Sequence, residues 1–214
     1  SERAIELNPD FVEAHINRGN IKLRMDEVAE AEEAFRVAIK LDSGNAMARA
    51  SLGVALREAG DLEAAEEECR KAIELAPTLP EAHNSLGNVL KAKEDWQSGK
   101  EAFMKAIGCR GEYLDAHLNL AAVMFKAGDI DGAEAQYREI LKKHEDLAEA
   151  HAGLGVLLLA AGHLEKAVES FREAVKNKPS LGLAQYNLAT AAGVELGETE
   201  ATAIRELLED KNLP

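Results

Sequence analysis

The sequence predicts an all-α protein, a solenoid assembled from repeated helix-turn-helix units. Two observations lead to this prediction. First, the chain is similar to itself at a spacing of 34 residues, which separates Gly19 from Gly53 and Gly53 from Gly87. Second, each period contains two stretches of about a dozen residues with apolar side chains at helical spacing, joined by a short turn. Self-similarity at this period is typical of helical repeat arrays.

Small and aromatic residues recur in strict phase along the chain. The small residues at positions 8 and 20 of each unit are Gly19, Gly53, Gly87, Ala121 and Gly155, and Ala31, Ala65, Gly99, Ala133 and Ala167. Position 24 holds Phe35, Cys69, Phe103, Tyr137 and Phe171, and Pro9, Pro77 and Pro179 stand at position 32. These landmarks resemble the tetratricopeptide repeat. The resemblance implies a right-handed superhelical solenoid in which the first helix of each unit, helix A, lines a concave groove and helix B follows it.

The phase of the landmarks divides the chain into repeats. We expect five full repeats at 12–45, 46–79, 80–113, 114–147 and 148–181. Residues 1–11 are expected to end a truncated preceding repeat, so we interpret the chain as part of a longer array. Residues 182–214 are expected to form a degenerate last repeat, with a capping helix over about 199–210.

The second repeat illustrates the expected units. Helix A is predicted over Ala46–Ala59 and helix B over Leu62–Leu75. Gly60 suits the left-handed position that ends a helix, and Asp61 suits the N-cap of the next one. The first and third repeats have Asp26-Glu27 and Glu94-Asp95 at this turn. They lose the glycine, and we expect them to keep a capping carboxylate.

Composition excludes several classes of function. The 214 residues are 46% hydrophobic, with a net charge of −14 from 39 acidic and 25 basic residues. Nucleic-acid binding needs a basic surface, which this balance argues against. The longest apolar run, Gly153 to Ala161, is too short to span a membrane. No targeting segment is recognised, and the compartment stays open. Of the two cysteines, Cys69 is expected in the core and Cys109 at the surface.

The sequence offers no recognisable catalytic or cofactor motif. We find no HExxH, no glycine-rich phosphate loop and no GxSxG turn, so we expect no enzyme activity, no cofactor and no metal. Histidine recurs at position 4, where Arg49 and Gln185 also occur, and we expect a structural role there; the histidines are His15, His83, His117 and His151. The acidic run Glu66-Glu67-Glu68 is interpreted as a solvated face of a B helix.

The face that lines the groove holds the candidate binding residues. Positions 5, 9 and 12 of helix A fall on one stripe because their spacing is three and four residues. This stripe is polar in the third repeat and apolar from the fourth onward. The predicted partner-binding residues, including the position-6 amide of the fourth repeat, are Asn84, Asn88, Leu118, Asn119, Ala122, Phe125, Val156, Leu159 and Tyr186.

Chaperone-binding members of the family hold a carboxylate with lysine, asparagine and arginine at set positions. Read from the third repeat, this chain has Asn84, Asn88 and Asn119 at three of them, but Glu149 and Gly153 where the last two cations should stand. Binding of chaperone C-termini is therefore not expected.

We interpret the chain as a non-enzymatic scaffold that binds a peptide or helix of a partner protein in the concave groove. The acids at position 2, Glu81, Asp115 and Glu149, lead us to expect basic as well as apolar residues in that partner. Two alternatives remain: self-association through the same apolar surface or through the open N-terminal edge, and a substrate-recruiting arm of a larger enzyme.

Overall fold

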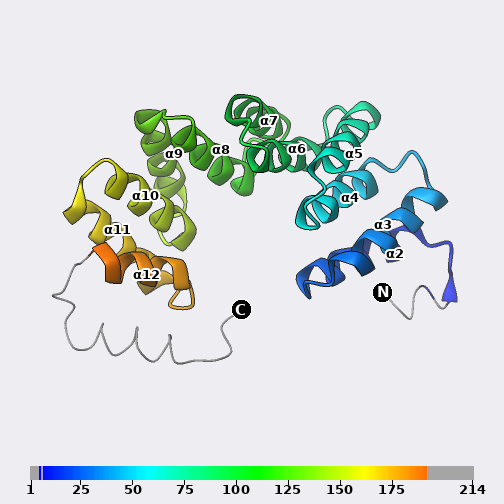
Figure 1. Ribbon diagram of the computed structural model, residues 1–214, viewed down its shortest axis with the longest axis horizontal. Helices are drawn as coiled ribbons and strands as arrows, with labels where there is room; N and C mark the ends of the chain where they lie inside the picture. Colours follow the sequence, from blue (N-terminus) through cyan, green and yellow to red (C-terminus); the bar gives the residue numbers. More distant parts are fainter. Residues whose placement is uncertain (1–4, 6, 192–214) are drawn as a thin grey trace. The chain divides into compact units, whose positions relative to one another are not determined.

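The computed structural model describes residue 5 and residues 7–191, and this part of the chain is helical, without a strand. None of its helices is long and apolar enough to cross a membrane. Figure 1 shows the helices in chain order. They are α2 (Val12–Arg24), α3 (Val28–Leu41), α4 (Ala46–Glu58), α5 (Leu62–Leu75), α6 (Pro80–Ala92), α7 (Trp96–Cys109), α8 (Leu114–Lys126), α9 (Ile130–Lys143), α10 (Ala148–Ala160), α11 (Leu164–Asn177) and α12 (Gly182–Ala191).

The chain forms two compact units, Ser1–Val123 and Met124–Pro214, which we describe separately. In the first unit, α2 packs against α3, α4 against α5 and α6 against α7, and α3 also contacts α4 as α5 contacts α6. In the second unit, α10 packs against α9 and α11, and α12 contacts both α10 and α11. The expected all-α helical repeat fold is confirmed in both.

The predicted helix bounds of the second repeat agree with the structure. Helix α5 covers the predicted Leu62–Leu75, and α4 ends at Glu58, one residue before the predicted end. Gly60 has a φ of 86°, and the Asp61 carboxylate accepts a hydrogen bond of 3.1 Å from the backbone N–H of Ala64. The predictions for residues 1–4, residue 6 and the capping helix over 199–210 fall outside the described residues.

The two turns without glycine take the same backbone conformation as the others. Asp26 has a φ of 62° and Glu94 a φ of 60°, in the left-handed region that side chains disfavour. In the third repeat, Asp95 caps the helix by accepting from the N–H of Ser98 at 3.1 Å. The expected carboxylate cap of the first repeat is wrong, because Glu27 makes no cap and binds Lys22 instead.

These turns generate the first prediction. Glu94→Gly and Asp26→Gly should each raise the free energy of unfolding by about 0.5–1 kcal/mol, because glycine removes the left-handed strain at some entropic cost. Gly60→Ala is the matched reverse change, since a Cβ at Gly60 would meet nothing within 4 Å and would add only strain. Urea denaturation measures all three. A loss of stability in Glu94→Gly would show that its side chain contributes more than the strain costs.

Helices A and B of one repeat interlock through the small residue at position 8. A Cβ on Gly19 would lie 2.5 Å from the ring of Phe35, and one on Gly87 would lie 2.6 Å from the ring of Phe103. Gly155 and Phe171 are arranged in the same way, at 2.6 Å. All three phenylalanines are fully buried. A side chain at position 8 would therefore displace the aromatic ring from the core.

The second repeat has Cys69 in place of the aromatic residue. Its Sγ lies in the space that a Cβ on Gly53 would need, and the carbonyl oxygen of Ala65 is 3.1 Å from that point. The shorter side chain is thus accompanied by a close approach of α5 to α4. Cys69 is fully buried, as expected, and burial raises the pKa of its thiol to about 12. Cys109 is exposed, also as expected.

We predict that Cys69→Phe destabilises the protein by about 1–3 kcal/mol, because the space between α4 and α5 is already closed and the ring must force them apart. The measurement is the midpoint of urea unfolding. The reverse change in a neighbouring repeat, Phe103→Cys, should cost about 3 kcal/mol by leaving a cavity. A stabilised Cys69→Phe variant would mean that an empty space lies beside the thiol.

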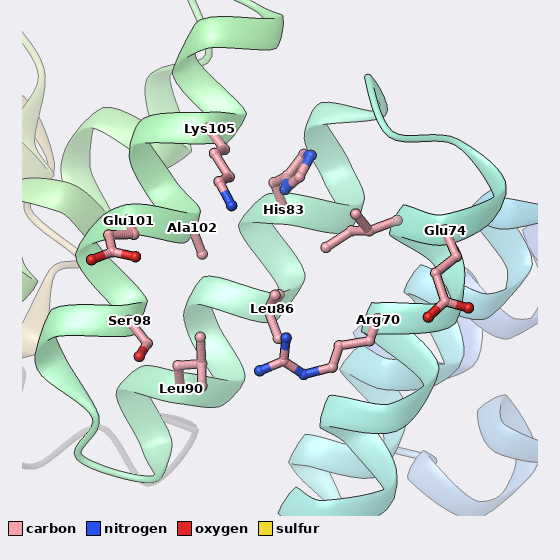
Figure 2. Close-up of a pocket in the computed structure, with 10 residues that line it drawn as sticks. Arg70, Glu74, His83, Leu86, Leu90, Ser98, Glu101, Ala102 and Lys105 are labelled. Atoms are coloured by element: carbon pink, nitrogen blue, oxygen red, sulfur yellow. The ribbon is translucent and has the colours of Figure 1, made fainter.

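A cleft of ≈ 320 Å³ lies between the B helices α5 and α7. Figure 2 shows Arg70 and Glu74 on one side of it, Glu101 and Lys105 on the other, and Leu86 of α6 between them. Charges of both signs line this cleft, which therefore has no preference for one charge type. We do not assign it a function.

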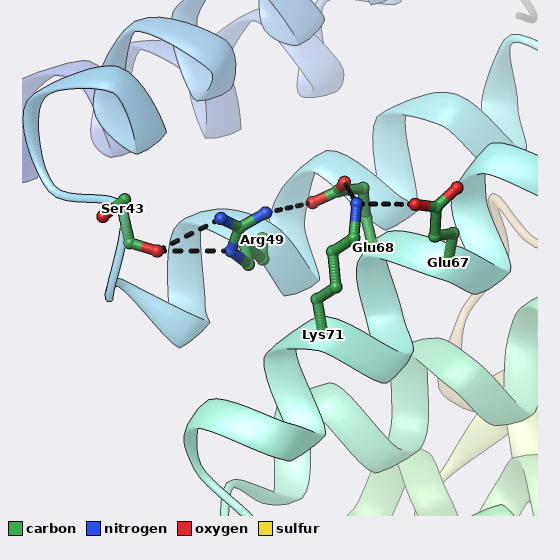
Figure 3. A network of polar contacts seen from close by, with 5 residues as sticks. All are labelled: Ser43, Arg49, Glu67, Glu68 and Lys71. Carbon is green, nitrogen blue, oxygen red and sulfur yellow. Dashed lines mark hydrogen bonds and ion pairs between the residues drawn. The ribbon is translucent and has the colours of Figure 1, made fainter.

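The acidic run on α5 is only partly the solvated face that we expected. Glu68 is 15% exposed and binds Arg49 of α4 at 2.8 Å and Lys71 at 2.9 Å, as Figure 3 shows. Glu66 is 20% exposed and binds Lys93 at 2.9 Å. Only Glu67, with 67% of its side chain exposed, fits the expectation. The interpretation was wrong for the other two because each also binds a cation from outside α5: Arg49 of α4, and Lys93 directly after α6.

Candidate partner-binding face

The A helices are anchored by a hydrogen bond that recurs in every described repeat. In each case the side chain at position 4 donates to the backbone carbonyl six residues earlier, in the turn between repeats. The pairs are His15–Pro9 at 2.7 Å, Arg49–Ser43 at 3.2 Å, His83–Pro77 at 2.8 Å, His117–Gly111 at 2.8 Å, His151–Glu145 at 2.8 Å and Gln185–Pro179 at 2.5 Å. We call this contact the position-4 bond.

The position-4 bond gives the recurring histidines a structural role. A carbonyl oxygen can only accept, so Nε2 of each histidine must carry the proton. The bond satisfies a backbone acceptor that the turn leaves free, and it holds the start of helix A against the preceding turn. Among the described residues, no group of three or more His, Cys, Asp or Glu side chains could hold a metal ion.

Position 4 therefore yields a third prediction. His83→Gln should keep the stability of the parent, because Gln185 already makes the same bond in the last repeat. His83→Leu should lose about 1 kcal/mol, since it fills the buried site without donating to Pro77. Thermal unfolding of the two variants compares them directly. Equal losses in both would show that the imidazole acts through packing and not through the bond.

In the first unit, the predicted amides form one connected cluster. Asn84 and Asn88 lie on α6, where the Asn88 amide donates to the backbone carbonyl of Asn84 at 3.2 Å. Asn119 of α8 donates to the Asn84 side-chain oxygen at 3.4 Å, and its own Oδ1 accepts from Nζ of Lys91 at 2.8 Å. The structure thus brings the three asparagines together and adds a lysine to them.

Lys91 is a functional candidate that the sequence analysis did not select. Its pKa is lowered, first by burial and second by the positive charge of Arg57 on α4. Arg57 pairs with Glu58 at 2.6 Å, but its Nε is buried without a hydrogen-bond partner. Both cations occupy position 12 of helix A, on the stripe that the repeat spacing defines. That shared position was the signal that could have identified them.

The remaining predicted residues of the first unit are apolar. Leu118 and Ala122 lie on α8, and both are partly exposed. Asp115, at the start of the same helix, is exposed. Glu81 on α6 is paired with Arg110 at 2.5 Å, and the guanidinium of Arg110 lies 4.9 Å from the centre of the Tyr113 ring. The charge of Glu81 is therefore largely compensated within the chain.

In the second unit, the predicted residues differ in accessibility. Phe125 at the end of α8 and Val156 on α10 are half-buried. Leu159 is 36% exposed, and Tyr186 on α12 is 65% exposed. The accessible apolar side chains of this unit's A helices therefore stand on α10 and α12.

The second unit also shows why α10 has a glycine at position 6, where the fourth repeat has Asn119. Gly153 stands there on α10, between Asn119 and Asn187 in the repeat order. A Cβ on Gly153 would lie 2.5 Å from the ring of Tyr137 on α9. Burial raises the pKa of Tyr137 to about 12. The ring of Tyr137 thus occupies the space beside position 6, where only glycine fits.

Comparison with known proteins places these features in a family. The protein-family model described as tetratricopeptide repeat matches residues 2–46, 16–80, 84–143 and 118–182. A segment of 44 residues is 43% identical to the human protein O-mannosyl-transferase TMTC3, and this match covers 21% of the chain and 5% of that enzyme.

Two solved structures are also similar to this one. YrrB, described as a tetratricopeptide repeat protein with an unusual peptide-binding site, has a TM-score of 0.60 and 23% identity over 86% of this chain and 95% of its own. A thermophilic repeat protein of Thermus thermophilus has a TM-score of 0.76 and 19% identity over 85% and 98%. At these identities the structures support the fold alone. The chain belongs to the tetratricopeptide repeat family, whose repeats serve as protein–protein interaction scaffolds.

Proposed function

We propose that this protein is a non-catalytic scaffold that binds a peptide or helix of a partner through the exposed side chains of its A helices. The observation that carries the proposal is the pair Leu159 and Tyr186, which are accessible apolar side chains on α10 and α12. Apolar side chains that a fold keeps exposed on one face are typical of interaction surfaces. The peptide-binding site named for YrrB supports this use of the fold.

The predicted site residues make different contributions to this function. In the second unit, Leu159, Tyr186, Val156 and Phe125 supply apolar contact. In the first unit, Leu118 and Ala122 supply apolar contact beside the three asparagines, whose amides suit the backbone of a bound segment. These are two surfaces of one chain, and each is proposed by itself.

The charge of the partner needs a separate argument. Basic residues were expected opposite Glu81, Asp115 and Glu149. Glu81 is already paired with Arg110, and Lys178 pairs with Glu149 at 2.8 Å, which lowers the pKa of that carboxyl. Of the three, only the exposed Asp115 has no ion pair in the described part of the chain. We therefore propose a basic residue in the partner near that position alone.

A fourth prediction tests the apolar surface. Peptides are selected from a random display library with the wild-type chain, and their affinities are measured by fluorescence anisotropy. Leu159→Asp should reduce the binding free energy of peptides at the second unit by about 1–3 kcal/mol, because the new carboxylate must be desolvated where the leucine made an apolar contact. Tyr186→Ala should act in the same direction. Glu67→Lys, an exposed change on α5, is the control and should leave binding unchanged.

The alternatives are separated by other measurements. Self-association through Leu159 and Tyr186 would appear as a mass that rises with concentration in light scattering and falls in Leu159→Asp. An enzyme arm is suggested only by the short match to TMTC3, of which the chain spans 5%, so that enzyme's activity is not transferred. If the library yields no peptide at all, the scaffold proposal fails and the cleft between α5 and α7 becomes the next surface to test.

A further inference from the structure

We propose that Arg57 and Lys91 form a binding point for an aspartate or glutamate side chain within an extended segment of the partner. This inference deepens the proposed function and rests on it, because it names the chemistry that the first unit recognises. It concerns α4, α6 and α8, all of whose relevant residues lie within Ser1–Val123.

Arg57 has donors that the chain does not use. A guanidinium carries five N–H groups, and in this structure one terminal nitrogen of Arg57 binds Glu58 at 2.6 Å. Its Nε is buried and lacks a hydrogen-bond partner. The side chain is 27% exposed, whereas Glu58 is 47% exposed and more solvated. Because the side chain is partly exposed, a second carboxylate that displaced the atoms covering Nε would satisfy a donor whose desolvation is otherwise uncompensated.

Lys91 occupies the same repeat position on α6 as Arg57 on the neighbouring α4, close enough to be affected by its charge, and its hydrogen-bond partner is neutral. Its ammonium donates to Oδ1 of Asn119 at 2.8 Å, and no ion pair with a carboxylate is found for it in the described part of the chain. Burial and the charge of Arg57 both disfavour its charged form. An anion between the two cations would relieve this repulsion and offset the burial.

In the described part of the first unit, neither cation binds a carboxylate of another helix, since Arg57 pairs only with Glu58 on its own helix. The protein has a net charge of −14, and several other cations of the first unit are bound to carboxylates from another helix. Lys22 pairs with Glu30 at 2.7 Å, Arg49 with Glu68 at 2.8 Å and Lys93 with Glu66 at 2.9 Å. Two neighbouring cations without a shared carboxylate, in a chain with an excess of acids, indicate that the missing anion comes from outside.

The surroundings favour a carboxylate in the middle of a segment. Val54 of α4 and Leu118 of α8 share the stripe with the cations and are partly exposed, one on each side of α6 in the repeat order. An extended segment that contacts both would cross α6 at its centre, where Asn88 and Asn119 can bond its backbone. Its acidic residue would then be internal, with apolar residues before and after it.

The test uses a random peptide library with blocked termini, displayed and selected against the wild-type chain. Because both ends are blocked, a carboxylate in a selected peptide can only come from a side chain. We expect peptides in which Asp or Glu lies between apolar residues. Replacing that residue by Asn or Gln should weaken binding about tenfold to a hundredfold, the range of charge-assisted hydrogen bonds.

Variants of the protein locate the anion. Arg57→Gln and Lys91→Gln should each weaken the binding of the acidic peptides by a similar factor. A peptide whose acidic residue has been replaced by Asn or Gln should bind the double variant as tightly as it binds the wild type. Arg70→Gln is the matched control, since it removes one exposed arginine of the same unit from α5. Glu58→Gln should strengthen binding, because it frees the terminal nitrogen of Arg57.

A charge swap separates recognition from a structural role of Lys91. Lys91→Glu should bind peptides with Lys at the acidic position better than the original peptides, while circular dichroism shows an unchanged helix content. Selected peptides without Asp or Glu, or acidic peptides that bind Arg57→Gln and Lys91→Gln as tightly as the wild type, would overturn the inference. If the selected peptides lack Asp and Glu, the scaffold function is still supported when their binding is weakened by Leu159→Asp. Phosphopeptides that outcompete the acidic ones would also overturn it.

Discussion

The close contact between helix A and helix B of one repeat is the constraint on which the other features depend. It exists because the residue at position 8 has no side chain beyond hydrogen in three repeats where a phenylalanine ring fills the space, as at Gly19, Gly87 and Gly155. Such packing leaves no room for polar groups and fixes the rotation of one helix against the other. With that rotation fixed, positions 9 and 12 stay at least partly exposed in α2, α4, α6, α8 and α10, whereas position 5 is buried at Ile16 and Ala50.

The position-4 bond extends this order from one repeat to the next. His83, Arg49 and Gln185 all form it, because each has a donor that reaches a carbonyl six residues earlier. Packing at position 8 and bonding at position 4 together account for the recurring small residues and histidines of helix A. Lys91 and Tyr186 take part in neither contact.

Charge is distributed in a way that separates structure from recognition. Most acids of the first unit that approach another helix have a cation there, as Glu68 has Arg49 and Glu81 has Arg110. The Glu81–Arg110 pair is partly exposed to water and contributes little to stability, whereas Arg49 and Glu68 are only 18% and 15% exposed. Arg57 and Lys91 depart from this pattern, and the second unit presents Leu159 and Tyr186 instead of cations. The two units therefore differ in the partner chemistry that they favour.

The sequence by itself determined the helices, the turns and the core positions. Periodicity and turn residues act within a few residues of themselves, so α5 and the left-handed Gly60 could be predicted from local pattern. The same spacing predicted the stripe of candidate residues. It also predicted that the asparagines and Tyr186 lie in different repeats. Only the tertiary structure decided which charges are compensated: Glu66 and Glu68 bind cations of neighbouring helices, while Nε of Arg57 has no partner. The physical reason is that a long charged side chain can reach partners on several helices. That choice depends on helix rotation and approach, which the spacing of residues along one helix does not specify.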